Sequence, residues 1–168
     1  ETSIMTRRQL TLFLLPTQSQ RVESIRETYN PVQYGLIKAH VTHCKEYELE
    51  EWENIEYNLR QKTYQRFSLS FGSPIRFSEG KGLMLSTVGE ITDFTRLRTE
   101  ILKGVSADPF RQEPHITLIH PRNGTCTEEI YGQTQALSPP SSFDFHQIHL
   151  IEQTDGGPWK VLDEFALR

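Results

Sequence analysis

The first half of the chain alternates apolar segments of strand length with segments of helical periodicity. The run LTLFLLP is apolar from Leu10 to Leu15 and ends at Pro16, as expected for a buried strand. The segment RFSLSFG alternates apolar and polar residues, which is typical of a half-buried strand. The pattern predicts, in order, a strand over 10–15, a helix over 22–29 that stops at Asn30-Pro31, a strand over 36–43, a helix over 49–59 and a strand over 66–72.

The second half repeats this order of elements. A helix over 91–101 is predicted to end before Gly104, and the helix that continues to Leu137 begins at the capping-box spacing of Thr125 and Glu128. The alternation changes phase between Phe145 and Ile148, which predicts a bulge. The predicted strands of this half cover 83–85, 114–121, 143–151 and 159–165, and the last two form a hairpin around Asp155-Gly156-Gly157.

Both halves therefore predict the same series: strand, helix, a strand that carries His-x-Thr, helix, strand. This indicates a diverged duplication of α+β class within one domain over residues 1–168. The two pseudo-symmetric lobes are expected at about 8–75 and 80–166, with residues 71–82 as the join. A pseudo-twofold axis would direct both His-x-Thr strands toward one central cleft.

The repeated motif is His40-Val41-Thr42 in the first half and His115-Ile116-Thr117 in the second. On a strand, residues i and i+2 project from the same face. Each histidine is therefore expected to share a face with its threonine, while the apolar residue between them packs into the core. Lys38 joins the first pair on that face and Ile119 joins the second.

Two imidazoles and two hydroxyls at one point suit the hydrolysis of a phosphoester without a metal. Attack on phosphorus needs a base that takes a proton from water and an acid that protonates the departing oxygen, and histidine fills both roles near neutral pH. The non-bridging oxygens gain charge in the transition state, so hydroxyl donors stabilise it. We therefore predict His40, Thr42, His115 and Thr117 as catalytic residues.

The segments KAHVTHC and EPHITLIHP resemble the paired motifs of the two-histidine (2H) phosphoesterase superfamily, which includes 2′-5′ RNA ligase-like proteins and cyclic phosphodiesterases. The segment GGPWKVLDEFAL resembles the closing strand of that family. The resemblance implies a bilobal fold of two antiparallel sheets, flanked by helices, that face each other across a cleft. It also implies cyclic-phosphate or phosphodiester chemistry without metal or cofactor, with His115 activating water and His40 protonating the leaving oxygen.

Other residues near the motifs are candidates for contact with a nucleoside. Tyr34, Phe110 and Trp159 offer rings for stacking on a base, and Arg111 offers a guanidinium for a phosphate, although a core or rim position is an alternative for each. The remaining histidines are expected to be structural or at the surface. His43 and His120 alternate to the faces opposite the motif pairs, and His146 and His149 lie on opposite faces of the last hairpin.

Composition and charge narrow the function. The net charge is −4 and the pI is near 5.9, which does not favour a surface for long nucleic acid, but a nucleotide or short RNA end remains compatible with it. No apolar run reaches the ~18 residues of a membrane span, and the beginning of the sequence lacks the apolar centre of a secretion signal. We expect a cytoplasmic monomer without membrane contact, whose two cysteines are reduced.

The sequence thus predicts a phosphoesterase that hydrolyses a 2′,3′-cyclic phosphate or a 2′-5′ phosphodiester of a nucleotide or RNA end. Two alternatives belong to other classes. A non-catalytic module could use the same cleft to bind nucleotide or RNA ends. A zinc site at His40, His43 and Cys44 is disfavoured because the two histidines alternate to opposite faces of one strand.

Overall fold

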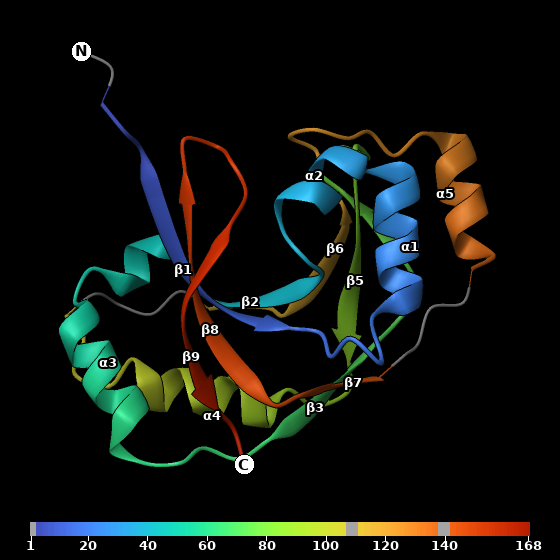
Figure 1. Ribbon diagram of the computed structural model, residues 1–168. Coiled ribbons are helices and arrows are strands. Elements are labelled where there is room, and N and C mark those ends of the chain that lie inside the picture. Colours follow the sequence, from blue (N-terminus) through green and yellow to red (C-terminus); the bar gives the residue numbers. More distant parts are fainter. Residues whose placement is uncertain (1–2, 107–110, 138–141) are drawn as a thin grey trace.

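The computed structural model describes residues 3–106, 111–137 and 142–168, whose strands join in one continuous antiparallel path (Figure 1). Neighbouring strands follow the order β7-β3-β5-β6-β2-β1-β8-β9, and β4 pairs with β5. The strands are β1 (Thr6–Phe13), β2 (His40–Cys44), β3 (Phe67–Phe71), β4 (Ile75–Phe77), β5 (Gly82–Val88), β6 (His115–Ile119), β7 (Ser142–Phe145), β8 (Gln147–Thr154) and β9 (Lys160–Ala166).

Helices cover the outside of this curled sheet in two groups (Figure 1). The first group is α1 (Gln20–Tyr29), α2 (Pro31–Leu36) and α5 (Glu128–Gln135), and the second is α3 (Trp52–Gln61) and α4 (Thr92–Ile101), preceded by a 3₁₀ turn (Glu46–Leu49). A helix from each half packs against the motif strand of the other half: α1 lies against β6, and α4 lies against β2. The two halves of the chain are therefore interlocked rather than placed side by side.

Most predicted elements are present, and the differences have local physical causes. The first helix, α1, ends at Tyr29 before Asn30-Pro31, as predicted, but a second helix that was not predicted, α2, begins at Pro31, where the missing N–H of proline is not needed. The cap of α5 is Thr127 rather than Thr125, and the Thr127 hydroxyl accepts a hydrogen bond from the Ile130 N–H at 3.2 Å.

The two separate sheets implied by the resemblance are not confirmed, because β2 and β6 pair directly and join the strands of both halves. Strand pairing also crosses the predicted boundary between the lobes at 75–80, since β3 pairs with β7 and β1 pairs with β8. The predicted bulge between Phe145 and Ile148 is instead a change of partner. Phe145 is the last residue of β7, which pairs with β3. Ile148 belongs to β8, which pairs with β1 and β9.

A buried ion pair fastens α4 to the turn that follows β2. Arg98 on α4 donates to both carboxylate oxygens of Glu48, at 3.1 and 2.7 Å, and to the backbone oxygen of His43. Both side chains are buried, so each charge depends on its partner. By contrast, Arg96 on the same helix pairs with Asp93, and both of these side chains are exposed.

Replacing Arg98 should therefore destabilise the fold far more than replacing its exposed neighbour. We expect Arg98→Met to lower the free energy of unfolding by about 3–5 kcal/mol, because Glu48 would remain as a buried charge without its guanidinium. The matched control Arg96→Met should cost no more than ~1 kcal/mol. Urea denaturation measures both, and equal losses would show that the buried pair does not fasten α4.

Candidate functional site

The two His-x-Thr motifs lie on neighbouring strands. Val41 of β2 pairs with Ile116 of β6 in an antiparallel register, and both are completely buried. One residue further in either direction, this register sets the histidine of each motif opposite the threonine of the other. Directly opposed residues have Cβ atoms about 4.5–5.5 Å apart, so the four polar side chains form one compact group on the face opposite the core.

Both motif strands have the same local irregularity after the threonine. The register between β1 and β2 skips His43, and the register between β5 and β6 skips Leu118. The sequence of burial is also identical along β2 and β6: half-buried, buried, half-buried, buried, buried. The two copies therefore present their histidine and threonine with equivalent geometry.

A backbone contact fixes the orientation of each motif imidazole. Nδ1 of His40 lies 2.8 Å from the oxygen of Lys38, and Nδ1 of His115 lies 3.2 Å from the oxygen of Glu113. A carbonyl oxygen only accepts hydrogen bonds, so Nδ1 carries the hydrogen in both rings. In the neutral form Nε2 then holds the free lone pair. Each ring thus has the tautomer that can exchange a proton through Nε2.

The surroundings of His40 favour its uncharged form. Burial lowers the pKa of His40 to about 4, and the positive charges of Arg26, His115 and His120 act in the same direction. Arg26 is itself buried on α1, where it contacts Glu23 and donates to the oxygen of Ile37 at 2.6 Å. In the free protein, His40 is therefore neutral at neutral pH.

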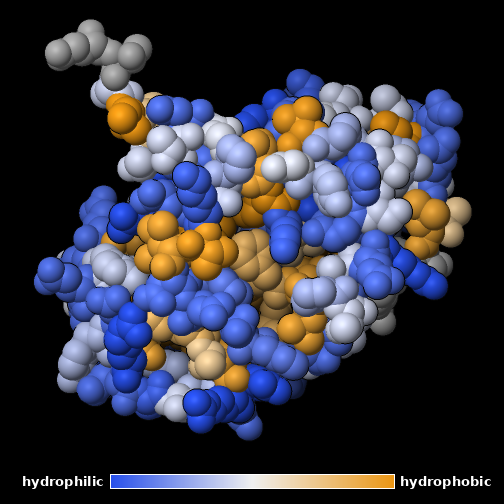
Figure 2. Space-filling view, in the orientation of Figure 1, coloured by the Kyte–Doolittle hydropathy of each residue, from blue (hydrophilic) through white to orange (hydrophobic). Residues whose placement is uncertain are grey.

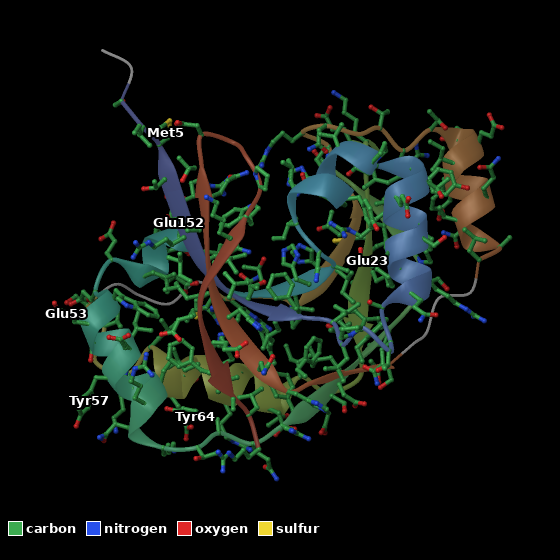
Figure 3. All side chains as sticks on the ribbon, viewed as in Figure 1. Met5, Glu23, Glu53, Tyr57, Tyr64 and Glu152 are labelled. Atoms are coloured by element: carbon green, nitrogen blue, oxygen red, sulfur yellow. The ribbon has the colours of Figure 1, made fainter. Side chains whose placement is uncertain are left out.

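Glu23 connects α1 to the start of the first motif strand (Figure 3). One of its carboxylate oxygens accepts a hydrogen bond from the Ala39 N–H at 3.1 Å. Glu23 also contacts Arg26, whose charge contributes to lowering the pKa of His40. The same carboxylate therefore holds both Ala39, the residue before His40, and the guanidinium of Arg26. The helix α1 thereby helps to position the first histidine, although the motif strand against which it packs is the second one, β6.

His43 lies on the core side, as the alternation predicts. It is completely buried, and its ring packs edge-on against Phe94 with centroids 5.1 Å apart. Within the described part of the chain its Nε2 has no hydrogen-bond partner. Burial, followed by the charge of Arg98, lowers the pKa of His43 to about 3. It is therefore a structural histidine that the fold keeps uncharged.

The prediction that His120 lies on the face opposite the motif pair is wrong, because the bulge at Leu118 shifts the alternation by one residue. Ile119 is completely buried instead of sharing the face of His115, and the next residue returns toward the motif side. His120 is half-buried, and its charge contributes to lowering the pKa of His40. Its Nδ1 accepts a hydrogen bond from the Arg122 N–H at 3.1 Å, so Nε2 carries the hydrogen in the neutral ring.

Two of the four candidate substrate residues meet at one cavity. Tyr34 and Trp159 line a cavity of about 500 Å³ that also borders Phe13, Lys38 and His149. Arg111 lies elsewhere, on a depression beside α4, and Phe110 is outside the described residues. Figure 2 shows apolar side chains lining the hollow of this face of the molecule.

Three residues beside the motifs were not predicted from the sequence as part of the site: Phe13, His149 and His120. The ring of Phe13 packs edge-on against His40, with centroids 6.1 Å apart, and against His149 at 5.1 Å. The segment 10–15 is apolar apart from Thr11, so its pattern gave no indication of which face Phe13 occupies. His146 and His149 also line the cavity, rather than being ordinary hairpin residues. The pairing of Thr11 with His149 could not be found without the sheet order.

Paired His-x-Thr motifs at the centre of a curled antiparallel sheet define the class of two-histidine phosphoesterases. A model of the 2′-5′ RNA ligase superfamily matches residues 14–157. The chain belongs to this family. The match supports the interpretation of the chain as a 2H phosphoesterase or RNA ligase-like enzyme. A comparison with curated protein sequences finds no match.

Several solved structures have a similar fold. Escherichia coli LigT complexed with 3′-AMP is 16% identical, with a TM-score of 0.64 over 96% of this chain and 98% of that chain. The apo form of LigT gives 15% identity and a TM-score of 0.66 over 98% and 99%. The protein TT0787 of Thermus thermophilus gives 17% identity and a TM-score of 0.57 over 96% and 98%. At these identities the comparisons show a common fold.

No group of three or more His, Cys, Asp or Glu residues with the arrangement of a metal site is present in residues 3–106, 111–137 and 142–168. In the same part of the chain, no helix is long and apolar enough to cross a membrane.

The neutral, buried state of His43 should make stability depend on pH. In the unfolded chain its pKa is about 6.5, whereas it is about 3 in the folded protein. As the pH falls below 6.5, the unfolded state binds a proton that the folded state does not, so the free energy of unfolding decreases toward pH 3. We expect His43→Leu to reduce this slope by up to about 1.4 kcal/mol per pH unit, measured by urea denaturation between pH 7 and 4. An unchanged slope would contradict the buried neutral state.

Proposed function

We propose that this protein is a metal-independent phosphoesterase that hydrolyses a 2′,3′-cyclic phosphate or a 2′-5′ phosphodiester of a nucleotide or RNA end. The observation that carries this proposal is the pairing of Val41 with Ile116, which gathers both His-x-Thr motifs on one face. Structures of the similar protein LigT hold 3′-AMP, phosphate, ATP and NADP+, all of which contain phosphoryl groups. These ligands support the proposal that this fold binds phosphoryl groups.

In the proposed reaction the phosphoryl group lies between Nε2 of His40 and Nε2 of His115. One neutral imidazole takes a proton from water as its oxygen attacks phosphorus, and the other, protonated, gives its proton to the departing ribose oxygen. The bond between phosphorus and that oxygen breaks as the new bond to water forms. The hydroxyls of Thr42 and Thr117 donate to the non-bridging oxygens, where negative charge accumulates.

We assign water activation to His115 and protonation of the leaving oxygen to His40. In the free protein His40 is neutral, since its pKa is lowered to about 4. An anionic phosphoryl group beside the ring favours the charged form, so binding of substrate raises the proton affinity of His40. The pair then shares one proton, and its two apparent pKa values belong to the pair rather than to either residue.

Substrate contacts outside the phosphoryl group are proposed for the predicted residues Tyr34 and Trp159, which border the cavity next to His40. Arg111 is proposed for a more distant part of a longer substrate, since it lies beside α4. Phe110, its neighbour in the chain, is proposed for the same role. A nucleotide or a short RNA end fits this arrangement, because it needs one phosphoryl site and a small number of neighbouring contacts.

Removing either motif histidine should abolish most of the turnover. His40→Ala and His115→Ala should each lower kcat by roughly 10²–10⁴ on adenosine 2′,3′-cyclic phosphate, assayed in excess EDTA. Thr42→Val and Thr117→Val should each cost about 1–3 kcal/mol of transition-state stabilisation, since each removes one hydrogen bond to a charged oxygen.

His43→Leu is the matched control, because His43 follows the same motif but packs into the core against Phe94. Its kcat should stay within about twofold of the wild type, provided that circular dichroism shows a folded protein. Binding of the nucleotide without turnover in the wild type would favour a non-catalytic binding module. Activity lost on chelation and restored by zinc would overturn the metal-independent mechanism.

The pH profile of kcat/KM should be bell-shaped with an unusually low acidic limb. Below the lower pKa of the pair both imidazoles are protonated, so no base is available and activity falls. Because the pKa of His40 is about 4, this loss should begin well below the ordinary histidine value of about 6.5. Initial rates at subsaturating cyclic nucleotide between pH 3.5 and 9 measure the profile. An acidic limb centred near 6.5 would contradict the uncharged state of His40 in the free protein.

A further inference from the structure

His120 lies just after the second motif strand and on the same face as the motif pairs. The strand β6 pairs with β5 at Thr117 and again at Ile119, so Leu118 is the extra residue of the bulge and the side chain of His120 returns to the motif side. In the register of β2 with β6, His40 lies opposite Thr117. His120 therefore follows Thr117 at the His40 end of the polar group, where it is half-buried.

A buried asparagine at the junction of α1 and α2 holds the backbone of His120. Asn30 is 1% exposed, and its side-chain oxygen accepts a hydrogen bond from the His120 N–H at 2.8 Å. Its amide nitrogen donates to the backbone and side-chain oxygens of Asn123, at 3.3 and 3.0 Å. The backbone oxygen of His120 accepts hydrogen bonds from the N–H groups of Asn123 and Gly124, at 3.2 and 2.9 Å. The end of β6 is therefore tied to both helices through one side chain.

The ring of His120 has the tautomer opposite to that of the motif histidines. Its Nδ1 accepts the hydrogen bond from the Arg122 N–H, so Nε2 carries the hydrogen of the neutral ring. In His40 and His115, by contrast, Nδ1 carries the hydrogen and Nε2 holds a lone pair. Two of the three rings can therefore take a proton through Nε2, whereas the third offers an N–H. A ring N–H suits an oxygen atom that carries negative charge.

The charges around His120 connect it to both motif histidines. Burial lowers the pKa of this ring, and the charges of Arg122, Arg7 and His115 act in the same direction. The charge of His120 in turn contributes to lowering the pKa of His40. His120 is therefore a neutral donor at neutral pH in the free protein. An anionic group beside it would strengthen the hydrogen bond and raise the proton affinity of the ring.

We propose that His120 is a third functional histidine of the site, which donates its Nε2–H to a non-bridging oxygen of the phosphoryl group, and that Asn30 is the residue that positions it. This rests on the phosphoesterase function proposed above. His120 exchanges no proton in the reaction. It stabilises the negative charge that accumulates on the oxygen beside the Thr117 hydroxyl, while His40 and His115 remain the acid–base pair.

Replacing His120 tests the hydrogen bond to the phosphoryl group. His120→Leu should lower kcat/KM for adenosine 2′,3′-cyclic phosphate by roughly 10- to 150-fold, which corresponds to the loss of one hydrogen bond to a charged group. His120→Gln should retain most of the activity, because the amide nitrogen at the end of its side chain still donates. The control His43→Leu removes a histidine that packs into the core against Phe94 and should leave kcat/KM unchanged.

Two results would overturn the role of His120 as a donor. The first is unchanged activity in His120→Leu, provided that circular dichroism shows a folded protein. The second is an equal loss in His120→Leu and His120→Gln, because the ring would then act through exchange of a proton, which an amide cannot perform.

A substitution at Gly124 tests the positioning by Asn30. A Cβ at Gly124 would lie 2.7 Å from Nδ2 of Asn30 and 2.9 Å from Cγ2 of Ile119, so the asparagine must shift. We expect Gly124→Ala to lower kcat/KM by roughly 10- to 100-fold, because it displaces His120. The same substitution should cost little more when it is made in the His120→Leu protein, since the two changes remove one interaction.

Gly132→Ala is the matched control, because a Cβ added at Gly132 of α5 meets nothing within 4 Å. It should leave kcat/KM unchanged in the wild type and in His120→Leu. Equal losses from Gly124→Ala in these two backgrounds would show that the asparagine supports the strand as a whole, and would overturn its assignment to His120.

A titration with inorganic phosphate separates failure of this contact from failure of the proposed function. In protein labelled with ¹⁵N in its histidine rings, phosphate should shift the Nε2 resonance of His120, which is identified by its absence from the His120→Gln protein. A shift without any turnover in the wild type would retain the contact and reject the phosphoesterase. Turnover without a shift would retain the phosphoesterase and reject the contact.

Discussion

The direct pairing of β2 with β6 is the constraint on which the rest of the site depends. Within the described residues, Val41 and Ile116 form the one residue pair between these strands, and both side chains are completely buried. A shift of one residue would turn either His-x-Thr pair into the core, because side chains alternate with a period of two. The flanking strands β1 and β5 hold the pair in place by their own antiparallel registers. The sheet thereby converts two distant sequence motifs into one polar group.

The two motifs reach equivalent geometry through the same local devices. Each motif threonine is followed by a one-residue bulge, at His43 and at Leu118, and each motif histidine contacts a backbone oxygen two residues earlier. A ring held in one tautomer and orientation needs little rearrangement when a phosphoryl group binds. Buried charges support this arrangement from outside the site: Arg26 acts from α1 and Arg98 from α4, each with a carboxylate partner.

The surroundings nevertheless make the two histidines different. Burial lowers the pKa of His40, whose ring also contacts Phe13 at the border of the cavity. Phe13, His149 and Trp159 come from β1, from β8 and from the connection between β8 and β9, so the cavity is built beside one motif. A nearly symmetric pair of motifs therefore stands in asymmetric surroundings. In the proposed mechanism, this asymmetry is what allows one histidine to act on water and the other on the nucleoside oxygen.

The sequence by itself determined most of the elements and which face the four motif residues share, because periodicity and the period-two alternation are local properties of the chain. It also placed His43 correctly, since the bulge at His43 shifts the alternation only for the residues after it. Only the tertiary structure decided the side of His120, because the bulge that shifts it arises from the register with β5. The single strand path, the partner change after Phe145 and the cavity at Phe13 were likewise decided by pairings between residues far apart in sequence. Such pairings depend on how distant segments pack together, which no local pattern encodes.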